Sequence, residues 1–167
     1  ETGLDYFRLK GDLSWQRDRF RTHIRAAIKS KLPLIIHTRN AQDDTISIMK
    51  EEGANSATGV MHCFTESYEM AKQAIDLGFY ISFSGIITFK NAETLRETVK
   101  KIPIENILIE TDSPYLAPVP NRGKLNEPAN VRYVAEKIAE LKGMPIEKVA
   151  EITTNNFFTL FTKCKAL

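Results

Sequence analysis

Short apolar runs alternate with amphipathic stretches along the whole chain. Apolar runs bounded by turn residues predict buried strands, and apolar residues repeated at helical spacing predict helices. Strands are expected at residues 32–36, ending at His37, and at residues 59–61, 79–83 and 104–109. Helices are expected at residues 14–30, 43–52, from Ser67 to Gly78, from Asn91 onward, and at residues 129–142, 145–151 and 154–161. Strands that are each followed by a helix favour a parallel sheet with crossover helices.

The boundaries of these helices are marked by polar residues and glycines. Ser14, Ser67 and Asn91 are predicted to begin helices, and Gly53 and Gly78 to end them. No strand alternates cleanly between apolar and polar residues, which predicts a sheet that is buried on both faces.

Both a doubly wound sheet and a (β/α)8 barrel are compatible with this α/β pattern. No linker or repeat divides the chain, so residues 1–167 are interpreted as one domain. A complete barrel typically needs about 250 residues, with roughly 200 as a lower limit. At 167 residues the chain is too short for a complete barrel.

Composition narrows the class of protein only slightly. Hydrophobic residues make up 43% and charged residues 26%, as in soluble globular proteins. The 23 Lys and Arg residues against 21 Asp and Glu residues neither require nor exclude a nucleic-acid partner. Cys63 and Cys164 show no metal-binding spacing and favour a reducing compartment. No apolar run approaches the ~18 residues of a membrane span, so we expect no membrane partner and a cytoplasmic location.

The candidate chemistry lies at the ends of the strand-like runs, where Glu1, His37, His62 and Asp112 occur. In a barrel, the carboxyl ends of successive strands converge on the face that carries the active site. Two imidazoles and two carboxylates meeting there would suit Zn²⁺, Mn²⁺ or a similar divalent ion. Spacing alone leaves a purely structural role for each histidine equally open.

Several segments also carry a resemblance to a known family. They are Glu-Thr-Gly-Leu-Asp-Tyr (1–6), Pro-Leu-Ile-Ile-His-Thr-Arg (33–39), Gly-Val-Met-His-Cys-Phe (59–64), Ile-Glu-Thr-Asp-Ser-Pro-Tyr-Leu (109–116) and Asn-Glu-Pro-Ala-Asn-Val (126–131). In this order they resemble the signatures of the TatD deoxyribonuclease family, and the resemblance covers essentially the whole chain. It implies a TIM barrel with two divalent metal ions in a complete site.

The resemblance also implies roles for the candidate residues. Glu1 would bridge the two metals, His37 and His62 would hold one, and Asp112 would hold the other beside the attacking water, so Asp112 and Glu1 are the expected catalytic residues. The family's first strand bears a His-x-His pair that this chain lacks. We therefore expect a barrel that lacks its first strands and self-associates through its open side.

The leading functional hypothesis is hydrolysis of phosphodiester bonds of DNA. Arg39 and Arg122 are candidate phosphate ligands, although a surface salt bridge would also explain Arg39. Tyr115 would either stack on a base or close its loop onto the barrel. One alternative keeps the same site for a small phosphoester, lactone or amide. Another is an inactive fragment or a half-barrel that needs a partner chain.

Overall fold

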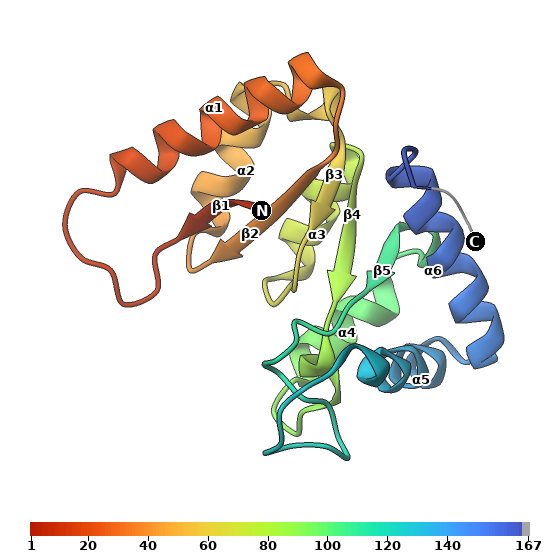
Figure 1. Cartoon of the computed structure of the whole chain (residues 1–167). Coiled ribbons are helices and arrows are strands. Elements are labelled where there is room, and N and C mark those ends of the chain that lie inside the picture. Colours follow the sequence, from red (N-terminus) through yellow and green to blue (C-terminus); the bar gives the residue numbers. More distant parts are fainter. Residues whose placement is uncertain (165–167) are drawn as a thin grey trace. The chain divides into compact units, whose positions relative to one another are not determined.

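The computed structural model describes residues 1–164 and shows a five-stranded sheet with flanking helices (Figure 1). The strands are β1 (Thr2–Asp5), β2 (Leu34–Arg39), β3 (Gly59–Met61), β4 (Phe79–Phe83) and β5 (Ile107–Ile109). The helices are α1 (Ser14–Ser30), α2 (Gln42–Glu51), α3 (Tyr68–Asp76), α4 (Glu93–Lys101), α5 (Val131–Lys142) and α6 (Ile146–Leu160). Hydrogen-bonded neighbours in the sheet follow chain order from β1 to β5. The predicted parallel sheet is confirmed.

The chain divides into two compact units, Glu1–Ile81 and a second that begins at Ser82. The first contains the parallel pairs β1–β2, β2–β3 and β3–β4, in which Gly3 lies opposite His37 and Ile36 lies opposite Met61. The prediction of one domain stays a prediction.

The core of the first unit forms where α1 packs against β1 and α2. Phe20 and Ile24 of α1, Leu4 of β1 and Met49 of α2 are completely buried there. Phe20 and Ile24 are four residues apart, the spacing of residues on one face of a helix. This packing fixes β1, which carries candidate site residues.

Strand β2 departs from the predicted burial on both faces. Leu34 and Ile36 are buried on one face, whereas Ile35, two residues from His37 on the other face, is 38% exposed. Successive side chains of a strand point to opposite faces. The face of β2 that carries His37 and Arg39 is therefore accessible within this unit.

In the second unit, α5 and α6 pack against β5, and α4 packs against α5. Val99 of α4, Ile138 of α5 and Val149 of α6 are completely buried, as is Ile107 of β5. Strand β5 begins at Ile107 and not at residue 104, because residues 104–106 form a 3-10 turn.

Two helix boundaries differ from prediction for a local reason. Ser14 is the first residue of α1 and not its cap, because its N–H and its hydroxyl both donate to the carboxylate of Asp12. Helix α4 starts at Glu93 and not at Asn91, since Arg96 donates to the carbonyl oxygens of Phe89 and Lys90 and holds that segment outside the helix.

The two helices predicted at residues 145–151 and 154–161 are one continuous helix, α6. The polar residue at the expected break, Thr153, donates its hydroxyl to the carbonyl of Val149 one turn earlier. This bond satisfies a hydroxyl that is almost completely buried, so no interruption is needed.

Candidate metal centre

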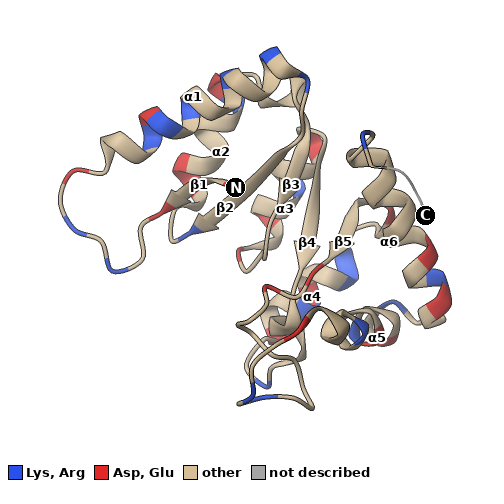
Figure 2. Cartoon of the chain, in the orientation of Figure 1, with Lys and Arg blue, Asp and Glu red and all other residues tan. Residues whose placement is uncertain are grey.

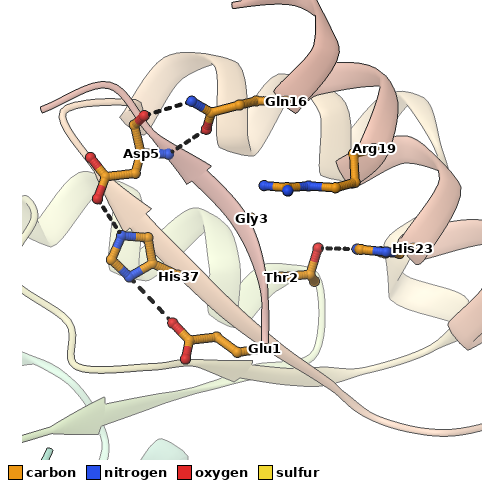
Figure 3. Close-up of a pocket in the computed structure, with 8 residues that line it drawn as sticks. All are labelled: Glu1, Thr2, Gly3, Asp5, Gln16, Arg19, His23 and His37. Atoms are coloured by element: carbon orange, nitrogen blue, oxygen red, sulfur yellow. Dashed lines mark hydrogen bonds and ion pairs between the residues drawn. The ribbon is translucent and has the colours of Figure 1, made fainter. Parts of the chain in front are cut away.

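His37 lies between the carboxylate of Asp5, at the end of β1, and that of Glu1, directly before β1, as Figure 3 shows. Its Nε2 is 3.1 Å from Oδ2 of Asp5, and its Nδ1 is 3.5 Å from Oε1 of Glu1. The same oxygen of Glu1 is 3.8 Å from Nε2 of His62. One carboxylate oxygen thus faces two imidazoles that come from different strands.

The register of β1 and β2 produces this arrangement. Gly3 pairs with His37, and Glu1 and Asp5 lie two residues to either side of Gly3, on the same face of the strand. Gly3 has a φ of 132°, and a Cβ at this position would clash with the backbone carbonyl of His37. A residue without a side chain is therefore required for β1 to approach β2 this closely.

Asp5 was not among the predicted site residues, and it is held firmly in place. The buried side chain of Gln16 accepts from the backbone N–H of Asp5 at 2.9 Å and donates to its carbonyl at 2.8 Å. The N–H of Phe7 donates to Oδ1 of Asp5, which leaves Oδ2 for His37. The signal in the sequence was its spacing of four residues from Glu1 along one strand.

His62 follows β3 directly and is positioned by its backbone, because its N–H donates to the carbonyl of Ile36 at 2.8 Å. Glu66, four residues later, is a second residue that the sequence did not indicate. Burial raises the pKa of Glu66, although a hydrogen bond from the Asn40 backbone and the charge of His37 oppose that increase. Glu66 lies in a loop, where no periodicity marks it.

A pocket of about 350 Å³ opens beside this centre, lined by Glu1, Thr2, Gly3, Asp5, Gln16, Arg19, His23 and His37 (Figure 3). His23, which comes from α1, meets Thr2 there, with Nδ1 2.6 Å from the threonine hydroxyl. His23 therefore has a local partner apart from the carboxylates.

The donor types around Glu1 are those that bind divalent cations. Oε1 of Glu1 lies within 4 Å of one ring nitrogen of His37 and of one ring nitrogen of His62, and Asp5 adds a further carboxylate beside His37. Imidazole and carboxylate together are ligands for Zn²⁺ and similar ions. Asp5, which contacts the ring nitrogen opposite Glu1, is placed as the carboxylate that commonly orients a ligand histidine.

Arg39, the predicted phosphate ligand of this unit, is exposed at the end of β2. Its guanidinium carbon lies 3.5 Å from the centroid of the Phe7 ring. The stacking orients the guanidinium, and no ion pair of Arg39 is found among the described residues. The expected alternative, a surface salt bridge, is therefore not the arrangement observed in this part of the chain.

The remaining predicted site residues belong to the second unit. Asp112 follows β5 after Glu110 and Thr111 and has a φ of 59°, a conformation that Asp tolerates better than most residues. Tyr115 is 71% exposed and its N–H donates to the carbonyl of Asp112 at 3.0 Å. Arg122 stacks on Phe89 at 3.8 Å and donates to the carbonyl of Ala117, contacts that anchor the loop.

The structure thus brings together Glu1, His37 and His62 within the first unit. Asp112 lies at the corresponding place after its own strand in the second unit, and its participation in the same site stays a prediction.

A model of the family described as TatD related DNase matches residues 1–162. An uncharacterized metal-dependent hydrolase of Escherichia coli K12, YcfH, is 52% identical over 161 residues, which is 96% of this chain and 61% of that protein. The Bacillus subtilis protein YabD, described in the same words, is also 52% identical, over 96% of this chain and 63% of its own length. The chain spans about three fifths of the length of these relatives.

Solved structures agree. The structure of YJJV, a TatD homologue of E. coli, matches with a TM-score of 0.88 and 30% identity, over 97% of this chain and 62% of that one. A TatD-family hydrolase from Entamoeba histolytica matches with a TM-score of 0.84 and 27% identity, over 98% and 62% of the two chains. The predicted fold class is confirmed as an α/β fold with a parallel sheet that matches this type of structure over part of its length.

Proposed function

The chain belongs to the family of TatD-related DNases, and from that premise we propose that it supplies the metal-binding residues of a hydrolase that cleaves phosphodiester bonds of DNA. The observation that carries the proposal is the carboxylate oxygen of Glu1, which faces the imidazoles of both His37 and His62. Imidazole nitrogen and carboxylate oxygen are both ligands of Zn²⁺ and similar divalent ions.

Glu1, His37 and His62 would hold one ion, and Glu1 and Asp112 would hold the second. A pair of divalent ions supplies Lewis-acid stabilisation and a water of lowered pKa to such a reaction. The contribution of the chain itself is positional. Glu1 contacts both imidazoles, and Asp5 holds the orientation of His37 through its Nε2.

Asp112 would act on the attacking water, whose orientation it would fix and whose proton it would accept. Its backbone supports this role, because the carbonyl of Asp112 accepts from the N–H of Tyr115 and the residue is thereby held in a turn three residues beyond the end of β5. A carboxylate in this role typically contributes about 10²–10⁴-fold to the rate.

In the first unit, Arg39 is a better candidate for binding phosphate than the basic residues of helix α1. Figure 2 shows basic positions along α1, but Arg21 and Arg25 are paired there with acidic residues of α2 or directly after it. Arg39 instead presents a stacked guanidinium on the face of β2 that carries His37. Tyr115 and Arg122 are the proposed contacts in the second unit, Tyr115 for a base and Arg122 for a phosphate.

The alternative enzyme reading keeps this centre for a small phosphoester, lactone or amide. The net charge of only +2 favours it, since it provides little general attraction for a polyanion. The third reading, a half-barrel that acts only with a partner chain or by self-association, is supported by the accessible face of β2 around Ile35, which is 38% exposed. No helix among residues 1–164 is long and apolar enough to cross a membrane.

The test is hydrolysis by the purified chain, supplied with Zn²⁺ or Mn²⁺, of a labelled DNA oligonucleotide, a nitrophenyl phosphate, a lactone and an amide. We expect release of nucleotides, reduced about 10²-fold or more by Asp112→Asn and unchanged by Asp18→Asn, which alters a carboxylate exposed on α1. Turnover of only a small substrate would favour the second reading. Absence of all turnover, or full activity of Asp112→Asn, would overturn the proposal.

A further inference from the structure

The segment Asn126–Val131, which contributes no residue to the proposed centre, contains a buried amide directed at the segment of Asp112. Asn126 is 6% exposed. Its Nδ2 donates to the carbonyl of Thr111 at 2.8 Å and to the carbonyl of Tyr115 at 2.7 Å. Its backbone N–H donates to the carbonyl of Pro114 at 2.9 Å. One residue thus binds the backbone on both sides of Asp112.

The orientation of this amide is fixed by its partners. Oδ1 of Asn126 accepts from the N–H of Glu127 at 3.0 Å and from Nδ2 of Asn130 at 2.9 Å. Asn130 in turn accepts from Nδ2 of Asn121 at 2.9 Å. A reversed amide would direct oxygen at two carbonyls and nitrogen at two donors, so only one orientation satisfies all four contacts.

This chain of amides ties the loop to a rigid element. Asn130, itself 6% exposed, directly precedes α5, whose residues Val134 and Ile138 are completely buried. Asn126 therefore connects the anchored start of α5 to the turn that carries Asp112. Within the turn itself, the N–H of Tyr115 donates to the carbonyl of Asp112.

We propose that Asn126 is a positioning residue, which fixes the backbone of Thr111–Tyr115 and thereby holds the carboxylate of Asp112 at the place required of a metal ligand. The proposal rests on the proposed function for the role of Asp112. Asparagine suits this task because one side chain offers two donors to the turn and one acceptor to its support. An aspartate of the same size would place an oxygen against both carbonyls.

The chain offers a matched control in Asn156. It is also buried, at 8% exposed, and its Nδ2 also donates to two carbonyls, those of Ile104 at 3.0 Å and Ile107 at 2.8 Å. These carbonyls belong to the 3-10 turn before β5 and to its first residue, whereas those held by Asn126 lie beyond its end. Asn126→Ala and Asn156→Ala therefore each remove two donated bonds to carbonyls within the same unit, but only the first removes them from the segment of Asp112. Asn126→Ala also removes the acceptor of Glu127 and Asn130.

Two measurements test the proposal on the whole chain. In hydrogen exchange, Asn126→Ala should accelerate exchange in residues 111–116 roughly tenfold, and Asn156→Ala should leave that segment unchanged. In competition with a chromogenic chelator, Asn126→Ala should weaken Zn²⁺ binding about 10–100-fold, and Asn156→Ala less than twofold. Should Asn126→Ala fail to fold, Asn130→Ala removes the support of the amide and should accelerate exchange of the same segment to a smaller degree.

The outcomes separate this inference from the proposed function. A wild-type chain that binds no Zn²⁺ would contradict the role of Asp112 as a ligand, while hydrogen exchange would still decide whether Asn126 fixes the segment. A wild-type chain that binds Zn²⁺ as tightly as Asn126→Ala, or equal acceleration of residues 111–116 by both alanine variants, would overturn the positioning role.

Discussion

The imidazole of His37 lies opposite Gly3 in the register of β2 and β1, with the carboxylate of Asp5 at Nε2 and that of Glu1, directly before β1, at Nδ1. The absence of a side chain at Gly3 lets the two backbones approach, and the positions two residues away supply Glu1 and Asp5. The short segment around Gly3 therefore supplies both Glu1, the proposed metal ligand, and Asp5, the carboxylate that orients His37.

Gly3→Ala should lower the free energy of unfolding by more than the cost of placing an alanine at a positive φ. A side chain at a positive φ costs about 1–3 kcal/mol, and at Gly3 the added Cβ would also clash with the carbonyl of His37. Gly11 has a φ of 90° with nothing within 4 Å of an added Cβ, so Gly11→Ala isolates the conformational cost. Urea denaturation of both variants measures the difference, and an equal loss of unfolding free energy would show that the close approach is unimportant.

Glu52 should stabilise the first unit at neutral pH but not at low pH. Its pKa is lowered, chiefly by the hydrogen bonds from Arg25 at 2.6 and 2.8 Å, against the opposing effect of burial. A carboxyl group with a lowered pKa stabilises the fold above its unfolded-state pKa and loses that effect as pH falls through its folded-state pKa.

We therefore expect Glu52→Gln to lower Tm at pH 7 and to approach the wild-type Tm as the pH falls below the ordinary value of 4.5. Glu136→Gln, which removes a single exposed pair with Arg132, should change Tm little at any pH. A Tm difference for Glu52→Gln that persists unchanged at pH 3 would contradict the assignment.

Arg39→Ala should weaken the binding of single-stranded DNA roughly fivefold, about 1 kcal/mol, because the stacked guanidinium contributes one exposed phosphate contact. The slope of log Kd against log salt should fall by about 0.7, and Arg39→Lys should keep the slope. Arg25→Ala is the control, since that guanidinium is bound to Glu52. Fluorescence anisotropy measures the affinities, and the same slope for Arg39→Ala as for the wild type would exclude a phosphate contact.

Sequence patterns predicted the elements that depend on local periodicity. Helix α1 and strands β3 and β4 have the predicted bounds, and Ser67 caps α3 by accepting from the N–H of Met70. The predictions were wrong where a side chain distant in sequence determines the local backbone conformation. At residues 104–106, Asn156 donates to the carbonyls of Ile104 and Ile107 across about fifty residues of sequence.

The candidate site was predictable to a similar degree. Positions at the ends of strand-like runs, together with the family resemblance, indicated Glu1, His37 and His62. Asp5 was missed because its role depends on the pairing register of two strands, which the sequence of one strand does not contain. Glu66 was missed because it reaches its place through a loop. The family resemblance included the segment around Asn126, but the hydrogen bonds of its amide could not be predicted because they form only in the folded loop.

The central claim, that Glu1, His37 and His62 hold a divalent ion, is tested most directly by X-ray absorption on the Zn²⁺-loaded chain. We predict two imidazole nitrogens at about 2.0–2.1 Å and carboxylate oxygen at about 2.0–2.2 Å. The imidazole signal should be lost in His37→Ala/His62→Ala and kept in His23→Ala, whose ring lines the same pocket but is bound to Thr2. A wild-type spectrum without imidazole scattering, or one that the double variant leaves unchanged, would contradict the claim.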